Sequence, residues 1–193
     1  MRPHEPEQSL LGYGGVLVFI LGALAFNGLC GTFISNVGSY FNPEVSTLFA
    51  EAQEVNSWTP NKSLLGNLWP VIVAPISEEL TYRVGILGAL LTFFRKPQAI
   101  MLSSLVFALA HLQVYSPVVV VSTFVMGLLL AITYTMLGLR AAIMLHFLNN
   151  SQELWQPWIS GGHYSTVAYV LLMFAALLAF LYQLVRHRRL VLG

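Results

Sequence analysis

The sequence predicts an all-α protein, a polytopic membrane bundle of about six transmembrane helices. Of the 193 residues, 56% are hydrophobic and 9% are charged, whereas soluble domains carry roughly 25% charged residues. Apolar runs follow one another along the chain, and none of them alternates as a half-buried strand does. We therefore expect residues 1–193 to form a single integral membrane domain.

The predicted helices cover the apolar runs at residues 10–34, 64–94, 99–112, 117–137, 141–155 and 166–185. The second run is longer than a crossing of about 20 residues needs. Because Pro75 lies inside it, we expect a kink or break there. The first run contains Ala23-Leu24-Ala25, a possible cleavage site after the apolar stretch that begins at Leu10. The leader before this run holds one Arg and two Glu, however, a poor positive region for a signal peptide. We expect this run to be retained as a helix.

The segment between the first two runs, residues 37–63, predicts an interfacial helix. Asn42 can cap its start, and Pro43 suits the first helical position. An apolar stripe follows at helical spacing, formed by Val45, Leu48, Phe49, Ala52 and Val55. Such a helix is either a lid over a substrate entrance or a passive connector on the membrane surface, and the connector is the simpler expectation.

Basic residues predict the topology, because cytoplasmic loops collect Lys and Arg. With the amino terminus inside, six crossings place a set of basic residues together on the cytoplasmic side. These residues are Arg95, Lys96, Arg140, Arg186, Arg188 and Arg189. The opposite side receives Lys62, Glu44, Glu51, Glu54 and Glu153. We therefore expect a multi-pass protein with both termini in the cytoplasm. Its small size and small soluble surface favour the inner or cell membrane of a prokaryote.

Charge and cysteine content exclude several classes of function. The net charge is +1, so nothing indicates a nucleic-acid partner. Cys30 is the single cysteine, which excludes an internal disulfide and a cysteine-rich metal cluster.

Ionisable residues inside the apolar runs point to chemistry. They are Glu78, Glu79, Arg83, His111 and His146. A charge at the centre of a bilayer costs about 2.5–3.5 kcal/mol on insertion scales, and such residues usually face a protein interior where they pair or work. Glu79 and Arg83 are spaced to form an ion pair on one helix face, which leaves Glu78 free. His146 and Asn150 share the same helical spacing. We expect the three helices to direct these groups into one cavity.

Three motifs carry a resemblance to a known family. Glu78-Glu79-x-x-x-Arg83, Phe107-x-x-x-His111 and His146-x-x-x-Asn150, in this order, resemble the motifs of the CPBP family of intramembrane endopeptidases, which includes the CAAX prenyl endopeptidases. Ala74-Pro75, Ser103-Ser104 and Gly127 add to the likeness. Residues 70–150 would then be a CPBP-like catalytic core. In many members a glycine directly follows the arginine, whereas here it is displaced by one residue, to Gly85.

The resemblance implies an intramembrane endopeptidase that hydrolyses a peptide bond of a membrane-associated protein or peptide, for instance at a C-terminal sorting or processing signal. It implies that Glu78 activates water and that His111 holds this water or shares its proton. Glu79 would pair with Arg83, and His146 and Asn150 would donate to the oxyanion. In this form the enzyme needs no cofactor. Its partners are the substrate and the lipid bilayer.

Other functions stay open at this point. Two His and one Glu can also bind zinc, with a water in the fourth position. A transporter would bury the same residue types, and a non-catalytic binding or immunity protein could share the motifs. Cleavage of a membrane substrate distinguishes the protease from these alternatives.

Overall fold

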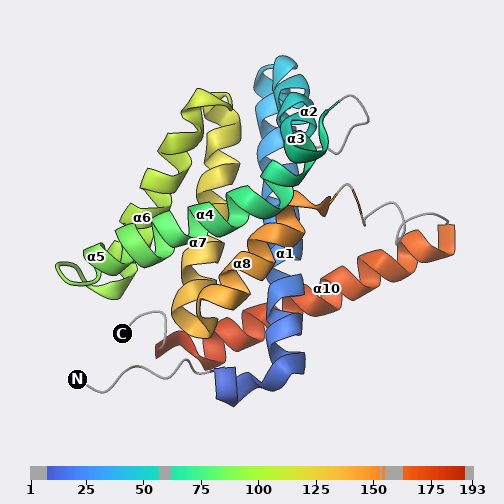
Figure 1. Cartoon of the computed structure of the whole chain (residues 1–193). Helices are drawn as coiled ribbons and strands as arrows, with labels where there is room; N and C mark the ends of the chain where they lie inside the picture. The colour runs from blue at the N-terminus through green and yellow to red at the C-terminus, as the bar shows by residue number, and fades with distance from the viewer. Residues whose placement is uncertain (1–7, 57–61, 153, 155–162, 190–193) are drawn as a thin grey trace.

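The computed structural model describes residues 8–56, 62–152, 154 and 163–189, and these residues form helices joined by short connections (Figure 1). The chain begins with α1 (Gln8–Phe41) and α2 (Glu44–Asn56). A nearly continuous helical stretch follows, made of α3 (Leu64–Leu68), η1 (Trp69–Val73), α4 (Ala74–Glu79), η2 (Leu80–Leu87) and α5 (Gly88–Leu90). The remaining elements are α6 (Lys96–Ala110), η3 (His111–Gln113), α7 (Pro117–Leu137), α8 (Leu139–Asn150) and α10 (His163–Arg186). The predicted all-α class is confirmed.

α1 continues to Phe41, so the prediction that the first helix ends at residue 34 is wrong. The polar residues after this point do not end the helix, because no proline interrupts the backbone before Pro43. Near its start, Gly12 has a φ of 61° and bends the chain. At the other end, a Cβ on Gly38 would meet Val45 Cγ1 of α2 at 2.8 Å, so a glycine is needed where α2 turns back against α1.

α2 confirms the predicted helix in the 37–63 segment. The amide of Glu44 donates to Asn42 Oδ1 at 3.1 Å, which is the expected cap. Val45 is buried and Val55 is 44% exposed, while the residues of the predicted apolar stripe between them are half-buried, so the stripe becomes less covered toward its end. Its location on a membrane surface stays a prediction, and residues 57–61 of the segment lie outside the described part of the chain.

The irregularity predicted near Pro75 is present as widened helical turns. Ahead of Pro75, the amide of Ala74 bonds to the carbonyl of Trp69, five residues back instead of four, as in a π-helix. A second π-helical segment, η2, follows Glu79. The stretch from Leu64 to Leu90 therefore does not end at the proline, but its side chains are rotated relative to those of a regular helix.

Three of the described helices are long and apolar enough to cross a membrane, namely Gly12–Phe41 of α1, Pro117–Leu137 of α7 and Val167–Arg186 of α10. α6 and α8 have 15 and 12 residues, fewer than the roughly 20 that a bilayer requires. The protein is thus a helical membrane bundle, while the count of about six crossings stays a prediction. Glu153 and Trp155, near the end of the fifth predicted helix, lie outside the described residues.

The core of the bundle joins α1, α7, α8 and α10 around Phe19, Leu130, Leu145 and Phe180. α1 and α10 cross so closely that a Cβ on Gly22 would lie 2.3 Å from both the carbonyl oxygen of Ala176 and Cβ of Phe180. Many apolar side chains outside this core are exposed, such as Phe33 at 68% and Leu171 at 63%. In a membrane bundle such side chains face lipid.

Basic residues gather at one end of the bundle. In Figure 1 the α5–α6 turn, the start of α8 and the end of α10 lie toward the lower left, whereas α2 lies at the top right. The first group of segments carries Arg95, Arg140 and Arg186, and α2 carries Glu44, Glu51 and Glu54. This separation of charge agrees with the predicted topology, although the side of the membrane on which each end lies stays a prediction.

Candidate active site

Glu79 and Arg83 form an ion pair that is fully removed from solvent. Arg83 Nε donates to Glu79 Oε2 at 3.0 Å, and both side chains are 0% exposed. The two residues lie one turn apart where α4 passes into η2. This is the pairing that their spacing predicts.

The guanidinium of Arg83 also connects the first motif to α6. Its Nη1 donates to Ser103 Oγ at 3.5 Å, and its Cζ lies 4.7 Å from the centroid of the Phe107 ring. Tyr82 meets the same ring edge-on, at 5.1 Å between centroids. A cation over an aromatic face is attracted by the ring quadrupole. Phe107 therefore supports Arg83 in addition to packing in the core.

Gly127 allows α6 and α7 to approach each other at this level. A Cβ at this position would lie 3.1 Å from Phe107 Cδ1 and 3.2 Å from the carbonyl oxygen of Ser104. The side chain of Ser104 is buried and donates to the carbonyl of Ile100 at 2.7 Å, so its hydroxyl is satisfied within α6. These small residues therefore let α7 pack closely against the second motif.

His146 of α8 lies between the two adjacent carboxylates. Its Nδ1 is 3.0 Å from Glu79 Oε1, and its Nε2 is 3.8 Å from Glu78 Oε2. Because an ionised carboxylate only accepts, Nδ1 of His146 carries the proton of the shorter contact. Glu79 is thus held through both oxygens, one by Arg83 and the other by His146.

His111, at the junction of α6 and η3, approaches Glu78 from another side. Its Nδ1 lies 2.8 Å from the carbonyl oxygen of Phe107 and therefore donates to it. In the neutral ring, Nε2 is then an acceptor, and it lies 3.8 Å from Glu78 Oε2. Tyr115 stacks on the imidazole with an interplanar angle of 13°. The ring orientation is fixed by backbone on one edge and by an aromatic face.

Glu78 Oε2 is the atom on which the two imidazoles converge, at 3.8 Å from each Nε2. These distances exceed a direct hydrogen bond, and polar groups at such separations are commonly bridged by a water molecule. The oxygen is buried and has no hydrogen-bond partner among the described residues. The Glu78 side chain as a whole is 27% exposed, which leaves a route to its surroundings. Of the two carboxylates, Glu78 is therefore the one with a buried oxygen that accepts no hydrogen bond from the described residues.

Asn150 is held by the irregular backbone at the proline. Its Nδ2 donates to the carbonyl of Pro70 at 2.9 Å. In the π-helical register this carbonyl would accept from residue 75, but Pro75 has no N–H. Asn150 supplies the missing donor. Its role as an oxyanion donor stays a prediction and would fall to its second N–H.

A chain of amides leads from α1 to Asn150. Asn27 Nδ2 donates to Asn149 Oδ1 at 3.0 Å, and Asn149 Nδ2 donates to Asn150 Oδ1 at 3.1 Å. The Pro70 carbonyl can only accept, so Asn150 turns its amide nitrogen toward it and its Oδ1 toward Asn149. Asn149 therefore donates to Asn150 and accepts from Asn27. Asn27, Asn149 and Tyr115 are not among the site residues predicted from the sequence. Asn27 and Asn149 did carry a signal, because both are amides inside apolar runs.

The donor types needed for zinc are present in part. Two imidazole nitrogens and one carboxylate oxygen face one another, which suits zinc chemically. Within the described residues, however, no three His, Cys, Asp or Glu side chains are arranged as a group that could hold a metal ion. The zinc alternative is therefore left to experiment.

Comparison with known proteins gives a family match for the middle of the chain. Residues 60–152 match the family model described as Rce1-like, type II CAAX prenyl endopeptidase. The range contains all six predicted site residues. No curated protein and no solved structure matches the chain significantly. Residues 60–152, which bring Glu78, His111 and His146 together, are therefore similar to the Rce1-like CAAX prenyl endopeptidases, and this match supports the CPBP family that the three motifs predict.

Proposed function

We propose that this protein is an intramembrane endopeptidase in which Glu78 activates the attacking water. The observation that carries the proposal is the position of Glu78 Oε2, buried and 3.8 Å from the Nε2 atoms of both His111 and His146. A water that reaches Glu78 through its 27% exposed side would meet a carboxylate base and a ring acceptor, which general base catalysis requires.

In the first step, water attacks the carbonyl carbon of the scissile bond and gives one proton to Glu78. The second hydrogen of the water is oriented by Nε2 of His111, which accepts because Nδ1 already donates to Phe107. A new C–O bond forms, and the carbonyl oxygen becomes an oxyanion. The product of this step is a tetrahedral intermediate beside a protonated Glu78.

Stabilisation of the oxyanion is assigned to His146. When His146 carries protons on both nitrogens, Nδ1 donates to Glu79 and Nε2 is left to donate to the substrate. Glu79 then acts on the substrate only through the ring it positions. The second N–H of Asn150 is the other candidate donor. Preorganised donors of this kind are worth roughly a hundredfold to a thousandfold in rate.

Collapse of the intermediate breaks the C–N bond. The proton held by Glu78 passes to the leaving nitrogen, which departs as an amine, and the acyl fragment departs as a carboxylic acid. Water is the only co-reactant consumed. Glu78 returns to its starting state.

The substrate we propose is a peptide presented from the membrane. The family description directs the first test to a prenylated C-terminal peptide. C-terminal sorting or processing signals of membrane proteins are the wider class. Both would reach a site built within a helical membrane bundle by moving along the bilayer.

The proposal is tested with purified full-length protein and a farnesylated peptide carrying a C-terminal tripeptide. We expect the wild type to release the tripeptide, as detected by mass spectrometry. Glu78→Gln should lower the rate by about a hundredfold to ten thousandfold, the usual contribution of a general base. Glu51→Gln, the same change on exposed α2, is the control and should leave the rate unchanged. Unimpaired cleavage by Glu78→Gln would overturn the proposed mechanism.

The zinc version is separated from this mechanism by chelation. We expect exhaustive treatment with a chelator, followed by metal analysis, to leave the rate of cleavage unchanged. Loss of activity that added zinc restores would instead assign Glu78 and the two imidazoles to a metal.

A further inference from the structure

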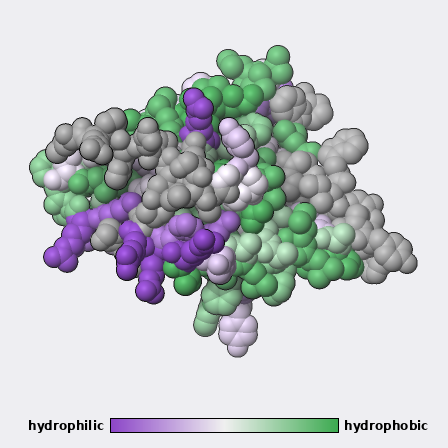
Figure 2. Space-filling model, turned by 90° about the horizontal axis from the view of Figure 1, so that it is seen from below, coloured by the Kyte–Doolittle hydropathy of each residue, from purple (hydrophilic) through white to green (hydrophobic). Residues whose placement is uncertain are grey.

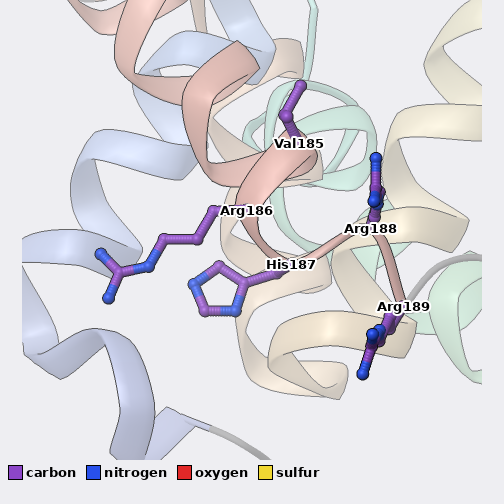
Figure 3. Close-up of a pocket in the computed structure, with 5 residues that line it drawn as sticks. All are labelled: Val185, Arg186, His187, Arg188 and Arg189. Carbon is purple, nitrogen blue, oxygen red and sulfur yellow. The ribbon is translucent and has the colours of Figure 1, made fainter.

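The carboxyl end of α10 carries a cluster of basic residues outside the proposed active site. Arg186, His187, Arg188 and Arg189 line an open hollow together with Val185. Figure 3 shows Arg186 and His187 on one side of the helix end, with Arg188 and Arg189 on the other. Seen from this end of the molecule, hydrophilic residues gather on one side of the face, next to apolar residues (Figure 2).

The position of the cluster along its helix is set by the membrane span that precedes it. Val167–Arg186 is a candidate span of 20 residues. At about 1.5 Å per residue this length matches the hydrocarbon core of roughly 30 Å. A span that crosses the core therefore delivers Arg186 and the residues after it to the level of the lipid headgroups.

Two exposed tyrosines mark the same level. Tyr182 precedes the cluster by one turn and is 62% exposed, and Tyr13 of α1 is 98% exposed. The two helices are tied together here, because Gln183 Nε2 donates to the carbonyl of Gly15 at 3.3 Å. Tyrosines concentrate where the bilayer meets water, with the ring in the apolar region and the hydroxyl at the headgroups.

The positive charge of the cluster is not neutralised within the part of the chain that the structure describes. Within the described residues, no carboxylate forms an ion pair with Arg186, Arg188 or Arg189. The guanidinium group binds phosphate oxygens through paired N–H donors. Arg140, at the start of α8, adds a further positive charge at this end of the bundle (Figure 1).

We propose that this cluster is a docking surface for the headgroups of anionic phospholipids. It holds the end of α10 at the membrane surface through Arg186, Arg188 and Arg189, with Tyr13 and Tyr182 at the boundary of the hydrocarbon. The proposal does not depend on the protease mechanism, because none of these residues belongs to the candidate active site.

The experiment measures lipid selectivity of the full-length protein by native mass spectrometry. The protein is equilibrated in micelles containing equal amounts of phosphatidylglycerol and phosphatidylcholine with the same acyl chains. We expect phosphatidylglycerol to be retained preferentially, and we expect each arginine to contribute roughly fivefold to this preference. The triple variant Arg186→Gln/Arg188→Gln/Arg189→Gln should lose most of it.

Two further variants make the outcome decisive. The triple Arg→Lys variant keeps the charge and should retain most of the preference, which also controls for folding. Lys62→Gln removes a positive charge from the segment that leads into α3 and should have no effect. Equal retention of both lipids by the wild type, or an unchanged preference in the triple Gln variant, would overturn the proposal. Complete displacement of the lipid by inorganic phosphate at constant ionic strength would show a free-anion site instead.

Discussion

At the scale of single residues, two neighbouring glutamates are placed in different surroundings. Glu79 is fully buried and bound through both oxygens, whereas Glu78 has a buried oxygen with no hydrogen-bond partner among the described residues. The spacing of Glu79 and Arg83 was sufficient to predict their pair. The contact between His146 and Glu79 was not predictable in the same way, because it depends on how α8 lies against α4.

Removing one partner of the buried Glu79–Arg83 pair should lower the stability of the protein more than removing both partners. Arg83→Met leaves the Glu79 carboxylate buried without its cation, which typically costs about 3–5 kcal/mol. The double variant Arg83→Met/Glu79→Gln removes both charges and should recover part of this loss. Denaturant or thermal unfolding of the detergent-purified variants measures both. If Arg83→Met alone were as stable as the wild type, the pair would have no structural role.

At the scale of the helices, a proline leaves a backbone carbonyl without its usual N–H donor, and a residue distant in sequence supplies one. The sequence predicts irregularity at Pro75, since proline has no N–H, but it does not reveal which group satisfies the freed carbonyl of Pro70. The structure assigns this to Asn150, from a helix remote in sequence. A local sequence pattern indicates which backbone groups lack hydrogen-bond partners. Which residues act as those partners depends on how the helices pack.

Replacement of the Asn150 amide should therefore weaken the junction of α8 and η1. Asn150→Asp keeps the size of the side chain but exchanges the donor for an acceptor facing the Pro70 carbonyl. An unsatisfied buried group of this kind costs about 1–3 kcal/mol. Asn36→Asp, the same change at an exposed position of α1, serves as control. Unfolding measurements that show equal stability for the two variants would contradict the assigned contact.

A matched pair of glycines tests the crossing of α1 and α10. A Cβ on Gly22 would lie 2.3 Å from backbone of α10, while a Cβ on Gly28 of the same helix meets nothing within 4 Å. Gly22→Ala should cost about 1–3 kcal/mol through overpacking. Gly28→Ala should be neutral or stabilise the helix by up to about 1 kcal/mol. The unfolding temperature of Gly22→Ala should therefore be clearly lower than that of Gly28→Ala. Equal changes in the two unfolding temperatures would argue against this crossing.

At the scale of the whole molecule, composition together with the apolar runs predicted a helical membrane bundle, and the order of its helices follows these runs. The end of the first helix was predicted less well, because α1 extends to Phe41. α6 and α8 have 15 and 12 residues, close to the short runs predicted for them, and both are shorter than a crossing. Hydropathy reports where a chain is apolar, but not whether a short helix is buried by its neighbours or spans the bilayer. The number of crossings is therefore a question for topology mapping.

Cysteine labelling in intact cells or sealed vesicles addresses the topology. In a Cys30→Ser background, Thr92→Cys places a thiol next to the α5–α6 turn, and Thr47→Cys places one on exposed α2. A membrane-impermeant reagent should label these two positions from opposite sides, with Thr92→Cys on the cytoplasmic side. Labelling of both from one side would contradict the separation of basic and acidic ends across the membrane.

Chemical rescue of Glu78→Ala most directly tests the claim that one free carboxylate activates water between two imidazoles. The truncated variant should lose cleavage of the farnesylated peptide by about a hundredfold or more, and added formate, a small carboxylate able to enter the space left by the side chain, should restore part of the rate. Wild-type cleavage by Glu78→Ala without formate would contradict the account.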